Sequence, residues 1–571
     1  VCLLTCILFS CAKDEKKSAM GGREYGGCLH IGESEYYQTL FPAAITDATS
    51  GFIASQIHEG LTSLNSLTLR PVPAVAESFS IDPSGLQYTF KLRKGVFFQD
   101  DSCFEGGKGR ELKAADVKYS FELLCTASAD NKNFSTTLKD RVVGANATYE
   151  ASLKNQKKAV SGIQLIDDYS LTISLKSPST VFLQILAEPA CAIIPHEAVE
   201  RYGNKMAVGC GPFRLGPSQS KDKNVLLLRN NNYFGKDSLG NSLPFLDSVS
   251  IAYLPSKENE FTKFSKGELD MVFSIPSNSV KQFVEQQIAD FEGKSPKFML
   301  DNSAEMTTQY YAFNLQKPPF NNPLVRKAFN LAIDRQKIID EILNGQAFGP
   351  GVKGITPPVY LKDGYDISLL HGYDFDPVQA RKLLAEAGYK EGKNFPKVNV
   401  ELNAGGGKNT DVVIELQKQL KENLGISIDF DIVSFEKKFD DDVMGRNSIM
   451  RDAWVADYAS PETFLNLFYG RTVPSDSLLP SFPNTSRYVS ENFDRYFSAG
   501  RDAKTRDSSN ANFFRAEQQL LDDAVVIVLW YEGNYRITRS YVKNSFTNAM
   551  RYRNFTEVYL QRYPENVSVQ P

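Results

Sequence analysis

Histidine, tryptophan and paired cysteine motifs are scarce in this chain, and their scarcity excludes several kinds of site. The 571 residues include four histidines and two tryptophans, and the histidines form neither H-E-x-x-H nor an i, i+4 pair. No C-x-x-C motif occurs, which removes zinc-ribbon and thioredoxin-like sites. G-x-S-x-G and other nucleophile–base motifs are also missing. We therefore expect no metal site, no cofactor and no catalytic centre.

Net charge and long apolar runs are lacking as well. The formal net charge is −4, a near-neutral balance that argues against a polyanion-binding surface, so we expect no nucleic-acid partner. No apolar stretch of about 18 residues follows residue 20, so we expect no membrane-spanning segment there. With 42% hydrophobic residues the chain can bury a large core, and its length predicts about two to four domains.

The N-terminal residues form a pattern of their own. Residues 1–10 are apolar or small and lead to Cys11, after which the polar run 12–18 begins. This order is typical of the end of a bacterial lipoprotein signal peptide, in which the cysteine becomes the lipidated N-terminus. A buried N-terminal strand is the alternative, but the polar tether favours the anchor. We expect residues 1–18 to be a signal remnant and tether, with the chain beginning inside its own signal and Cys11 attached to a membrane.

Five cysteines remain once Cys2 and Cys6 are removed with the signal and Cys11 is lipidated. They are Cys28, Cys103, Cys125, Cys191 and Cys210. An exported compartment permits one or two disulfide bridges and leaves at least one cysteine over. The pairing does not follow from the sequence.

Hydrophobic periodicity in the first half predicts both strands and helices. Residues 86–92 alternate apolar and polar side chains, as a half-buried strand does. Residues 114–124 place Val117, Phe121 and Leu124 on one face of an amphipathic helix. The stretch 131–158 is polar and mostly lacks periodicity, so we expect a surface excursion.

The second half predicts a βαβ unit. A strand at 398–402 leads through three glycines into a helix at 410–423 and a strand at 426–432. The glycine run is not a P-loop, because Leu402 stands where the first Gly is needed and Asn409 where Ser or Thr is needed. The acidic run 440–442 is expected to be a solvated face.

Several stretches occur in an order and spacing that point to one family. They are 90–96 (FKLRKGV) with 112–124, 209–215 (GCGPFRL), 233–235 with 266–270 (KGELD), 310–339 (YYAFNLQKPPFNNPLVRKAFNLAIDRQKII), 454–465 (WVADYASPETFL) and 516–531, followed by 541–543. Together they resemble the extracellular solute-binding proteins of family 5, the peptide-, nickel- and haem-binding receptors of ABC importers. The pattern of 454–465 is most similar to the oligopeptide-binding branch of that family.

The resemblance implies an α/β fold with two lobes around a cleft, the class II type of periplasmic-binding-protein fold with an extra inserted domain. Transferred to this chain, domain I would take 19–58, 183–303 and 532–571. The inserted domain II would take 59–182, and domain III, the second lobe, would take 304–531. We expect a monomer whose lobes close over a ligand by a hinge motion.

The resemblance also implies roles for single residues. The branch holds a peptide α-ammonium with the Asp of its W-x-A-D motif, here Asp457, and a carboxylate suits a buried ammonium because it accepts charge-assisted hydrogen bonds. A solvated loop aspartate is the alternative. Trp454 would wall a side-chain pocket or be a plain core residue. Arg451 matches an arginine that faces peptide carboxylates, or is a surface arginine. Phe435 and Tyr310 match a pocket tryptophan and a cleft tyrosine, or are core residues.

Other positions match or depart from the branch. Thr46 and Ala48 correspond to positions that contact the ligand backbone. Asn409 occupies the position of a carboxylate-contacting histidine, and Ala312 replaces a cleft glutamate. These two departures leave the preference for the ligand's C-terminus open.

The function implied is capture without chemistry by a lipid-anchored receptor in the cell envelope. An extended oligopeptide would add to strand edges in the cleft, with its side chains in hydrated pockets, and would be passed to the permease subunits of an ABC transporter. Within the family, the rival ligands are nickel chelates, haem and oligosaccharides, but only a ligand with a free ammonium needs Asp457. An exported peptidase is the rival from another class, and the missing nucleophile–base motif counts against it.

Overall fold

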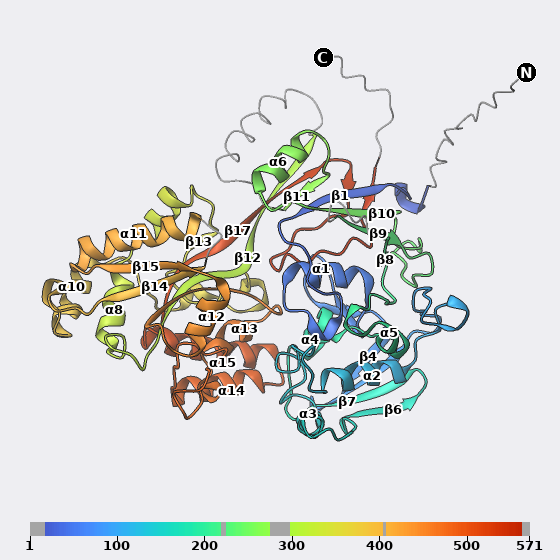
Figure 1. Ribbon diagram of the computed structural model, residues 1–571, viewed down its shortest axis with the longest axis horizontal. Coiled ribbons are helices and arrows are strands. Elements are labelled where there is room, and N and C mark those ends of the chain that lie inside the picture. The colour runs from blue at the N-terminus through green and yellow to red at the C-terminus, as the bar shows by residue number, and fades with distance from the viewer. Residues whose placement is uncertain (1–17, 218–223, 274–296, 404–406, 562–571) are drawn as a thin grey trace, which may run out of the picture.

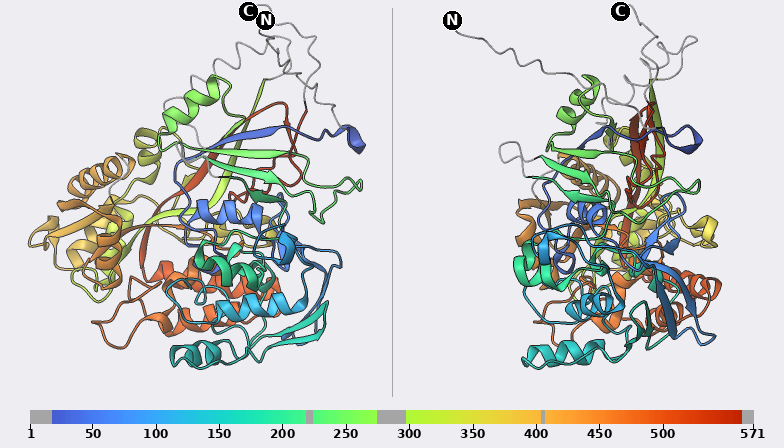
Figure 2. Two further views of the ribbon diagram at one scale, coloured as in Figure 1. Left: turned by 45° about the vertical axis from the view of Figure 1, so that its right-hand side comes forward. Right: turned by 90° about the vertical axis from the view of Figure 1, so that its right-hand side faces the viewer.

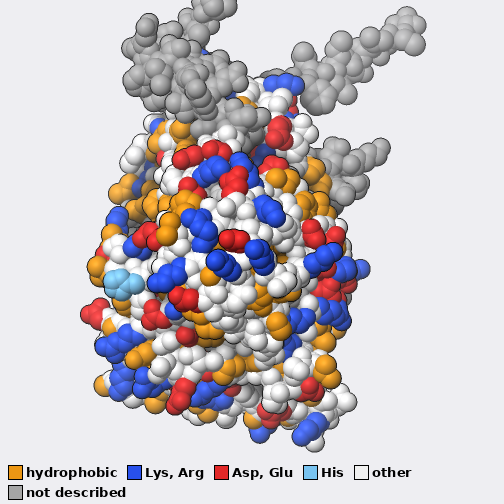
Figure 3. Space-filling view, turned by 90° about the vertical axis from the view of Figure 1, so that its left-hand side faces the viewer, with side chains coloured by type: hydrophobic (Ala, Val, Ile, Leu, Met, Phe, Trp, Pro, Cys, Tyr) orange, Lys and Arg blue, Asp and Glu red, His pale blue; other side chains and the backbone are white. Residues whose placement is uncertain are grey.

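The computed structural model describes residues 18–217, 224–273, 297–403 and 407–561. The predicted lipidation site Cys11 lies outside these residues. The structure has two lobes: β14, β15, α8, α10 and α11 lie on the left of Figure 1, and β1, β8–β10, α1 and α2 lie on the right. Figure 3 shows acidic and basic side chains intermixed on the left-hand face, as the near-neutral net charge suggests.

A large mixed sheet joins the lobes in the strand order β16-β12-β17-β11-β1-β10-β9-β8, with β13 beside β17. Its strands are β1 (Cys28–Glu33), β8 (Phe213–Leu215), β9 (Val225–Arg229), β10 (Ser248–Tyr253), β11 (Met271–Val272), β12 (Phe298–Phe313), β13 (Gly349–Pro350), β16 (Ile449–Val455) and β17 (Val526–Arg539). On the first-lobe side, α1 (Ala48–Ile57) packs against this sheet through Ile53 and Ile57, next to the buried Leu29 and Ile31 of β1.

The long strands β12 and β17 run side by side from one lobe into the other (Figures 1 and 2). Residues 298–304 of β12 pair with 533–539 of β17 beside β11, whereas residues 308–312 pair with 526–531 beside β16. The register shifts between Ala304 and Thr308. Irregular pairing of this kind bends a strand and strengthens its twist, so the change of direction between the lobes falls at this point.

A second core, the α2 core, is built around α2 and the sheet β4-β5-β7-β6 and buries side chains from Phe41 to Cys210 together with Tyr458. Its elements are β2 (Thr62–Leu64), β3 (Pro71–Pro73), β4 (Ala76–Ile81), β5 (Gln87–Leu92), β6 (Ile163–Asp167), β7 (Ser170–Ser174), α2 (Ala114–Leu124), α3 (Ala145–Leu153), α4 (Phe182–Ile185) and α5 (His196–Tyr202). The predicted strand at 86–92 and the helix at 114–124 are confirmed, and Val117, Phe121 and Leu124 are buried as expected.

The expectation of a surface excursion at 131–158 is wrong for part of the stretch, although residues 153–158 are exposed as expected. Phe134, Leu138 and Val142 are buried in the α2 core, and α3 follows them. Because these apolar residues stand four positions apart, they meet the core on one side of the turns that carry them. Because many polar residues stand between them, this spacing is hard to recognise in the sequence.

The second lobe contains most of the remaining α-helices of the described chain and a parallel strand pair. Its elements are α8 (Pro323–Leu331), α9 (Arg335–Lys337), α10 (Pro377–Glu386), β14 (Val398–Asn403), α11 (Gly407–Leu424), β15 (Ile428–Val433), α12 (Phe435–Val443), α13 (Glu462–Leu465), α14 (Glu491–Arg501) and α15 (Arg506–Asp522). Strands β14 and β15 pair in parallel around α11, so the βαβ unit is confirmed. A further core, the α15 core, buries Phe493 and Phe513 between α14 and α15 and extends to Tyr310. The first lobe also contains α6 (Lys257–Ser265), β18 (Val542–Lys543) and β19 (Tyr559–Leu560).

The prediction of a solvated acidic face at 440–442 is wrong for two of its residues. Asp441 and Asp442 are buried because each is neutralised by a lysine one turn away on α12. Lys438 lies 2.6 Å from Asp442, and Lys437 lies 2.5 Å from Asp441. Such i, i+4 pairs allow a helix to bury charge that a single carboxylate could not.

The five cysteines of the described chain are all free thiols: Cys28, Cys103, Cys125, Cys191 and Cys210. Across the same residues, no helix has both the length and the apolar character that crossing a membrane requires. The domain limits given above stay a prediction.

Candidate ligand-binding cleft

A cavity of about 260 Å³ lies between the α2-core region and the second lobe. One wall comes from residues 135–141 and 177–179, and the other from residues 454–502. Asp457 and Trp454 both line it, so the structure places these two predicted site residues in one cleft.

Asp457 is held in place by Thr463. Strand β16 ends at Val455, the chain turns, and α13 begins at Glu462, which brings Thr463 back beside Asp457. The Thr463 hydroxyl donates to Asp457 Oδ2 over 2.7 Å. It accepts from the Asp457 backbone N–H and from Trp454 Nε1, each at 3.2 Å. A hydroxyl has one donor and two acceptor sites, so this arrangement uses all of them.

Thr463 is a positioning residue that the sequence reasoning missed. The signal for it was present, because Thr463 stands inside the quoted stretch 454–465. The two ends of that stretch form one local unit: the turn carries the Asp457 carboxylate, and the helix α13 carries the hydroxyl that fixes it. The Trp454 indole is tied to the same hydroxyl, which explains why it lies at the cavity wall and not deep in the core.

The pKa of the Asp457 carboxyl is raised, chiefly because the cleft walls remove water from around it, while the hydrogen bond from Thr463 opposes the rise. The residue still reaches the solvent of the cleft. A carboxylate that is poorly hydrated but accessible is stabilised by an incoming cation. The electrostatics of this wall therefore favour a positively charged ligand group.

Contacts across the cleft hold the two walls together. Arg141 lies 2.8 Å from Glu462, whose side chain is almost fully buried. Its guanidinium also reaches the hydroxyl of Tyr458 at 3.5 Å. Tyr458, the neighbour of Asp457, packs into the α2 core. Asp457 thus stands where the second lobe meets the opposite wall.

Arg451 does not share the cavity with Asp457. Arg451 is on β16, opposite Tyr311 of β12, and its Nη2 donates a hydrogen bond to Gln309 Oε1 at 2.5 Å. Since side chains alternate along a strand, Arg451 lies on the face of β16 away from Trp454. Gln309 donates in turn to Glu532, at 3.0 Å.

This polar chain ends at a cation that the sequence reasoning missed. Lys408, at the start of α11, lies 3.4 Å from Glu532 and 5.1 Å from the centre of the Trp530 ring. Its neighbour Asn409 is half-buried. Lys408 therefore supplies a positive charge at the position before Asn409, whereas Asn409 itself is uncharged.

The other predicted residues lie elsewhere. Tyr310 is buried in the α15 core. Phe435 is 69% exposed at the start of α12 and belongs to an aromatic row: its ring centre is 6.2 Å from that of Phe439, which is 5.5 Å from that of Phe482. Phe482 lines the cavity, so the row leads to its rim. Thr46 and Ala48 are exposed around the start of α1 and do not line this cavity.

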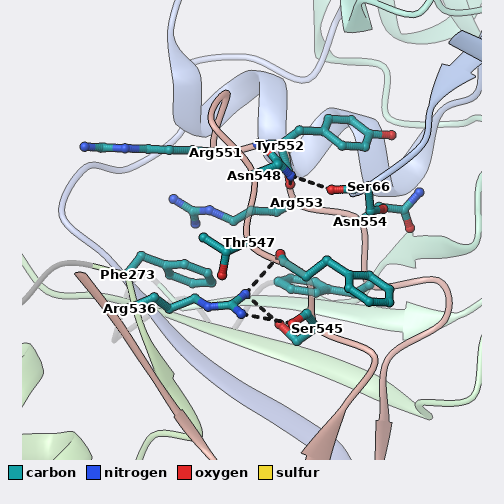
Figure 4. A pocket seen from close by; sticks show the side chains of 12 residues that line it. Ser66, Phe273, Arg536, Ser545, Thr547, Asn548, Arg551, Tyr552, Arg553 and Asn554 are labelled. Carbon is teal, nitrogen blue, oxygen red and sulfur yellow. Dashed lines mark hydrogen bonds between the residues drawn. The ribbon is translucent and has the colours of Figure 1, made fainter. Parts of the chain in front are cut away.

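A second, smaller cavity of about 30 Å³ lies beside the C-terminal segment (Figure 4). Three arginines line it, but each has an acidic partner: Arg536 pairs with Asp301 at 2.6 Å, Arg551 with Glu305, and Arg553 with Glu33. Figure 4 shows Arg536 also bonded to Ser545. A space of this size holds about one or two waters, and its charges are balanced, so it is not a ligand cleft.

Comparison with known proteins decides the family. A sequence model described as bacterial extracellular solute-binding proteins, family 5 (middle), matches residues 70–476. The chain belongs to this family. The matched stretch contains Asp457, Trp454 and Thr463, which line or position one wall of the cleft.

Curated relatives match over most of their length. The periplasmic oligopeptide-binding protein OppA of Escherichia coli (strain K12) is 27% identical over 514 residues, covering 88% of this chain and 87% of the relative. The probable di/tripeptide-binding protein 5 of Pseudomonas aeruginosa (strain UCBPP-PA14) is 26% identical over 504 residues, covering 86% and 87%.

Solved structures share the fold. DppA from Helicobacter pylori in complex with the peptide STSA superposes with a TM-score of 0.75 at 24% identity, covering 95% of this chain and 99% of that one. The unliganded open form of the murein tripeptide-binding protein MppA gives 0.70 at 21% identity, covering 94% and 97%. The predicted two-lobed α/β fold of this family 5 protein is confirmed.

Proposed function

We propose that this family 5 protein captures oligopeptides in the Asp457 cleft and delivers them to the permease of an ABC importer. The observation that carries the proposal is Asp457 itself, an accessible carboxylate that Thr463 fixes at the wall of the cleft. Relatives named for oligopeptide and di/tripeptide binding support the choice of ligand.

Asp457 accepts the hydrogen bonds of the peptide α-ammonium. A charge-assisted bond is short and strong, and the partly dehydrated cleft increases its contribution. Trp454 flanks the carboxylate and offers aromatic surface to the first side chain of the peptide. Recognition of a group that every peptide carries leaves the sequence of the ligand free to vary.

The protein binds and releases its ligand without altering it. The relatives are named as binding proteins, which supports this part of the proposal. A peptidase remains the competing function of another class, and incubation of a peptide with the protein followed by mass spectrometry separates the two. Recovery of intact peptide is the expected result, whereas cleavage products that vanish in heat-denatured protein would establish a peptidase.

Native mass spectrometry of protein purified without denaturation tests the ligand class directly. We expect adducts whose masses and fragments identify short peptides, and we expect Asp457→Asn protein, prepared in parallel, to carry far less of them. Co-purified haem, a nickel chelate or an oligosaccharide would assign the cleft to another branch of the family. Absence of bound peptide even after incubation with a tripeptide mixture would refute the proposal.

The protein is anchored in the cell envelope through Cys11 and works as a monomer. Relatives named as periplasmic support the compartment, and the apolar run before Cys11 followed by a polar tether supports the lipid. Cys11→Ser should leave a folded protein that partitions into the aqueous phase of a detergent separation, because a lipid anchor provides the membrane affinity. If the variant partitions as the wild type does, the lipid anchor is refuted, whereas the proposed peptide binding is not affected by that result.

A further inference from the structure

Most of the charged side chains that line the cavity around Asp457 already have a partner of opposite charge. The pairs are Arg141 with Glu462 at 2.8 Å, Arg501 with Asp502 at 3.1 Å, and Asp140 with Lys176 at 3.7 Å. Two charged residues of the lining are left, Asp457 and Lys139. Neither forms an ion pair with another residue in the part of the chain that the structure describes. The cavity therefore contains one negative and one positive group that a ligand can pair.

These two groups belong to opposite walls. Asp457 lies on the wall formed by residues 454–502, and Lys139 lies on the wall formed by residues 135–141 and 177–179. Lys139 directly follows Leu138, which is buried in the α2 core, and its backbone N–H donates to the Phe134 carbonyl at 3.0 Å. The side chain of Lys139 itself is exposed. The core thus fixes the backbone of Lys139 at the wall, while its ammonium stays available to a ligand.

The wall that carries Lys139 also carries hydroxyl groups. Ser135, Ser177 and Ser179 line the cavity from this side. The Oγ of Ser179 is buried and has no hydrogen-bond partner among the described residues. An ammonium and hydroxyls are both hydrogen-bond donors, and a carboxylate accepts from both. The two walls therefore differ in chemistry: one accepts the hydrogen bonds of a cation, and the other can donate to an anion.

We propose that Lys139 binds a carboxylate of the ligand while Asp457 holds its ammonium, so that the cavity favours peptides with a carboxylate close to their amino terminus. This inference rests on the proposed peptide function and deepens it. The carboxylate is either the C-terminus of a short peptide or the side chain of an acidic residue near the amino terminus, and Lys139 meets the same chemistry in both. A ligand that bonds to both walls also ties them together, which favours the closed form.

Calorimetry at low ionic strength, where charge pairs are least screened, tests this with two matched pairs of ligands. The pairs are Ala-Ala-Ala with its C-terminal amide, and Glu-Ala-Ala with Gln-Ala-Ala. If Lys139 takes the C-terminus, wild type should bind Ala-Ala-Ala about threefold to tenfold more tightly than the amide, as expected for one partly exposed charge pair. If Lys139 takes the side chain, wild type should prefer Glu-Ala-Ala to Gln-Ala-Ala by a similar factor.

Three variants show whether Lys139 causes the preference. Lys139→Gln removes the charge and should abolish the preference, whereas Lys139→Arg keeps the charge and should retain it. Lys132→Gln is the matched control, because Lys132 is an exposed lysine seven positions earlier that does not line the cavity. It should behave as wild type does.

The results distinguish this inference from the function on which it rests. If wild type binds none of the four peptides, the peptide function fails, and this inference fails with it. If wild type binds them but distinguishes neither pair, only the role of Lys139 is refuted. The same holds if Lys139→Gln keeps every preference that wild type shows, because the carboxylate is then bound by another group.

Discussion

At the residue scale, the carboxyl groups of this protein differ in accessibility and pKa according to the groups that surround them. Asp457 is fixed by a hydroxyl and remains open to the cleft, whereas Asp442 is neutralised by Lys438 and is closed off. Glu59 is a third case. It is half-buried, and the Tyr233 hydroxyl donates to its Oε1 over 2.7 Å. Burial raises the pKa of Glu59 from its ordinary 4.5 to about 7.

Glu59 therefore makes stability depend on pH. Because its pKa is higher in the folded state, its contribution is fully present below about pH 4.5 and is lost as the pH rises through about 7. Glu59→Gln keeps an acceptor for Tyr233 and removes the titration. Between pH 4.5 and pH 8, the wild-type free energy of unfolding should fall relative to that of the variant by about 2–3 kcal/mol. Urea unfolding at both pH values measures this, with Glu150→Gln, which removes an exposed carboxylate from α3, as control. A difference that does not change with pH would refute the assignment.

At the scale of the elements, strand β16 and the turn after it determine which side chains face the cleft. Alternation along β16 sends Trp454 to the cleft and Arg451 to the opposite face, where it joins Gln309. The resemblance suggested both residues as ligand contacts. A motif gives positions along the chain, but only the pleat of the strand shows which face each one occupies.

A role of Arg451 in selecting peptide length stays a prediction, because its side chain lies on the face of β16 away from the Asp457 cavity. Its backbone lies no more than about 20 Å from that of Asp457, since an extended chain rises roughly 3.3–3.6 Å per residue, and a tripeptide spans about 10 Å by the same rule. We expect Arg451→Ala to weaken binding of one peptide length more than others, because a carboxylate reaches the guanidinium only at a fixed distance from Asp457. Affinities for a series from dipeptide to hexapeptide test this. An equal loss at every length would assign Arg451 to the cleft as a whole, and no loss at any length would make it structural.

Local patterns were enough to predict several elements, and long-range pairings were not. The helix at 114–124 follows from its periodicity, and the βαβ unit around α11 follows from two apolar runs with a helix between them. The pair Arg141 and Glu462 joins residues 321 positions apart, and no local pattern marks them as partners.

At the scale of the whole molecule, two continuous strands and a small set of contacts link the lobes. Strands β12 and β17 cross between them with the register shift after Ala304, and Arg141 with Glu462 bridges the cleft. Strands that bend at an irregular register can act as a hinge, while the bridge favours the closed form. Closure around a ligand then presents one joined surface to the permease.

Ligand binding should therefore shift the molecule towards the closed form. Small-angle scattering of protein stripped of ligand should show a larger radius than the same protein with a tripeptide. Bound peptide should add about 2.7 kcal/mol of stability at a hundredfold excess over its dissociation constant. In Glu462→Gln, Arg141 loses its charged partner, so more peptide should be needed to reach the small radius. Equal radii for stripped and loaded wild type would refute the hinge.

The central claim is that Asp457 holds a peptide by its free amino terminus, and calorimetry with a tripeptide and its N-acetylated form tests it most directly. Wild type should bind the free tripeptide and lose most of that affinity on acetylation. Asp457→Asn should lose about 2–5 kcal/mol with the free peptide, the range for removing one partner of a buried charge pair, and should no longer distinguish the two forms. Equal binding of both forms by wild type would contradict the account.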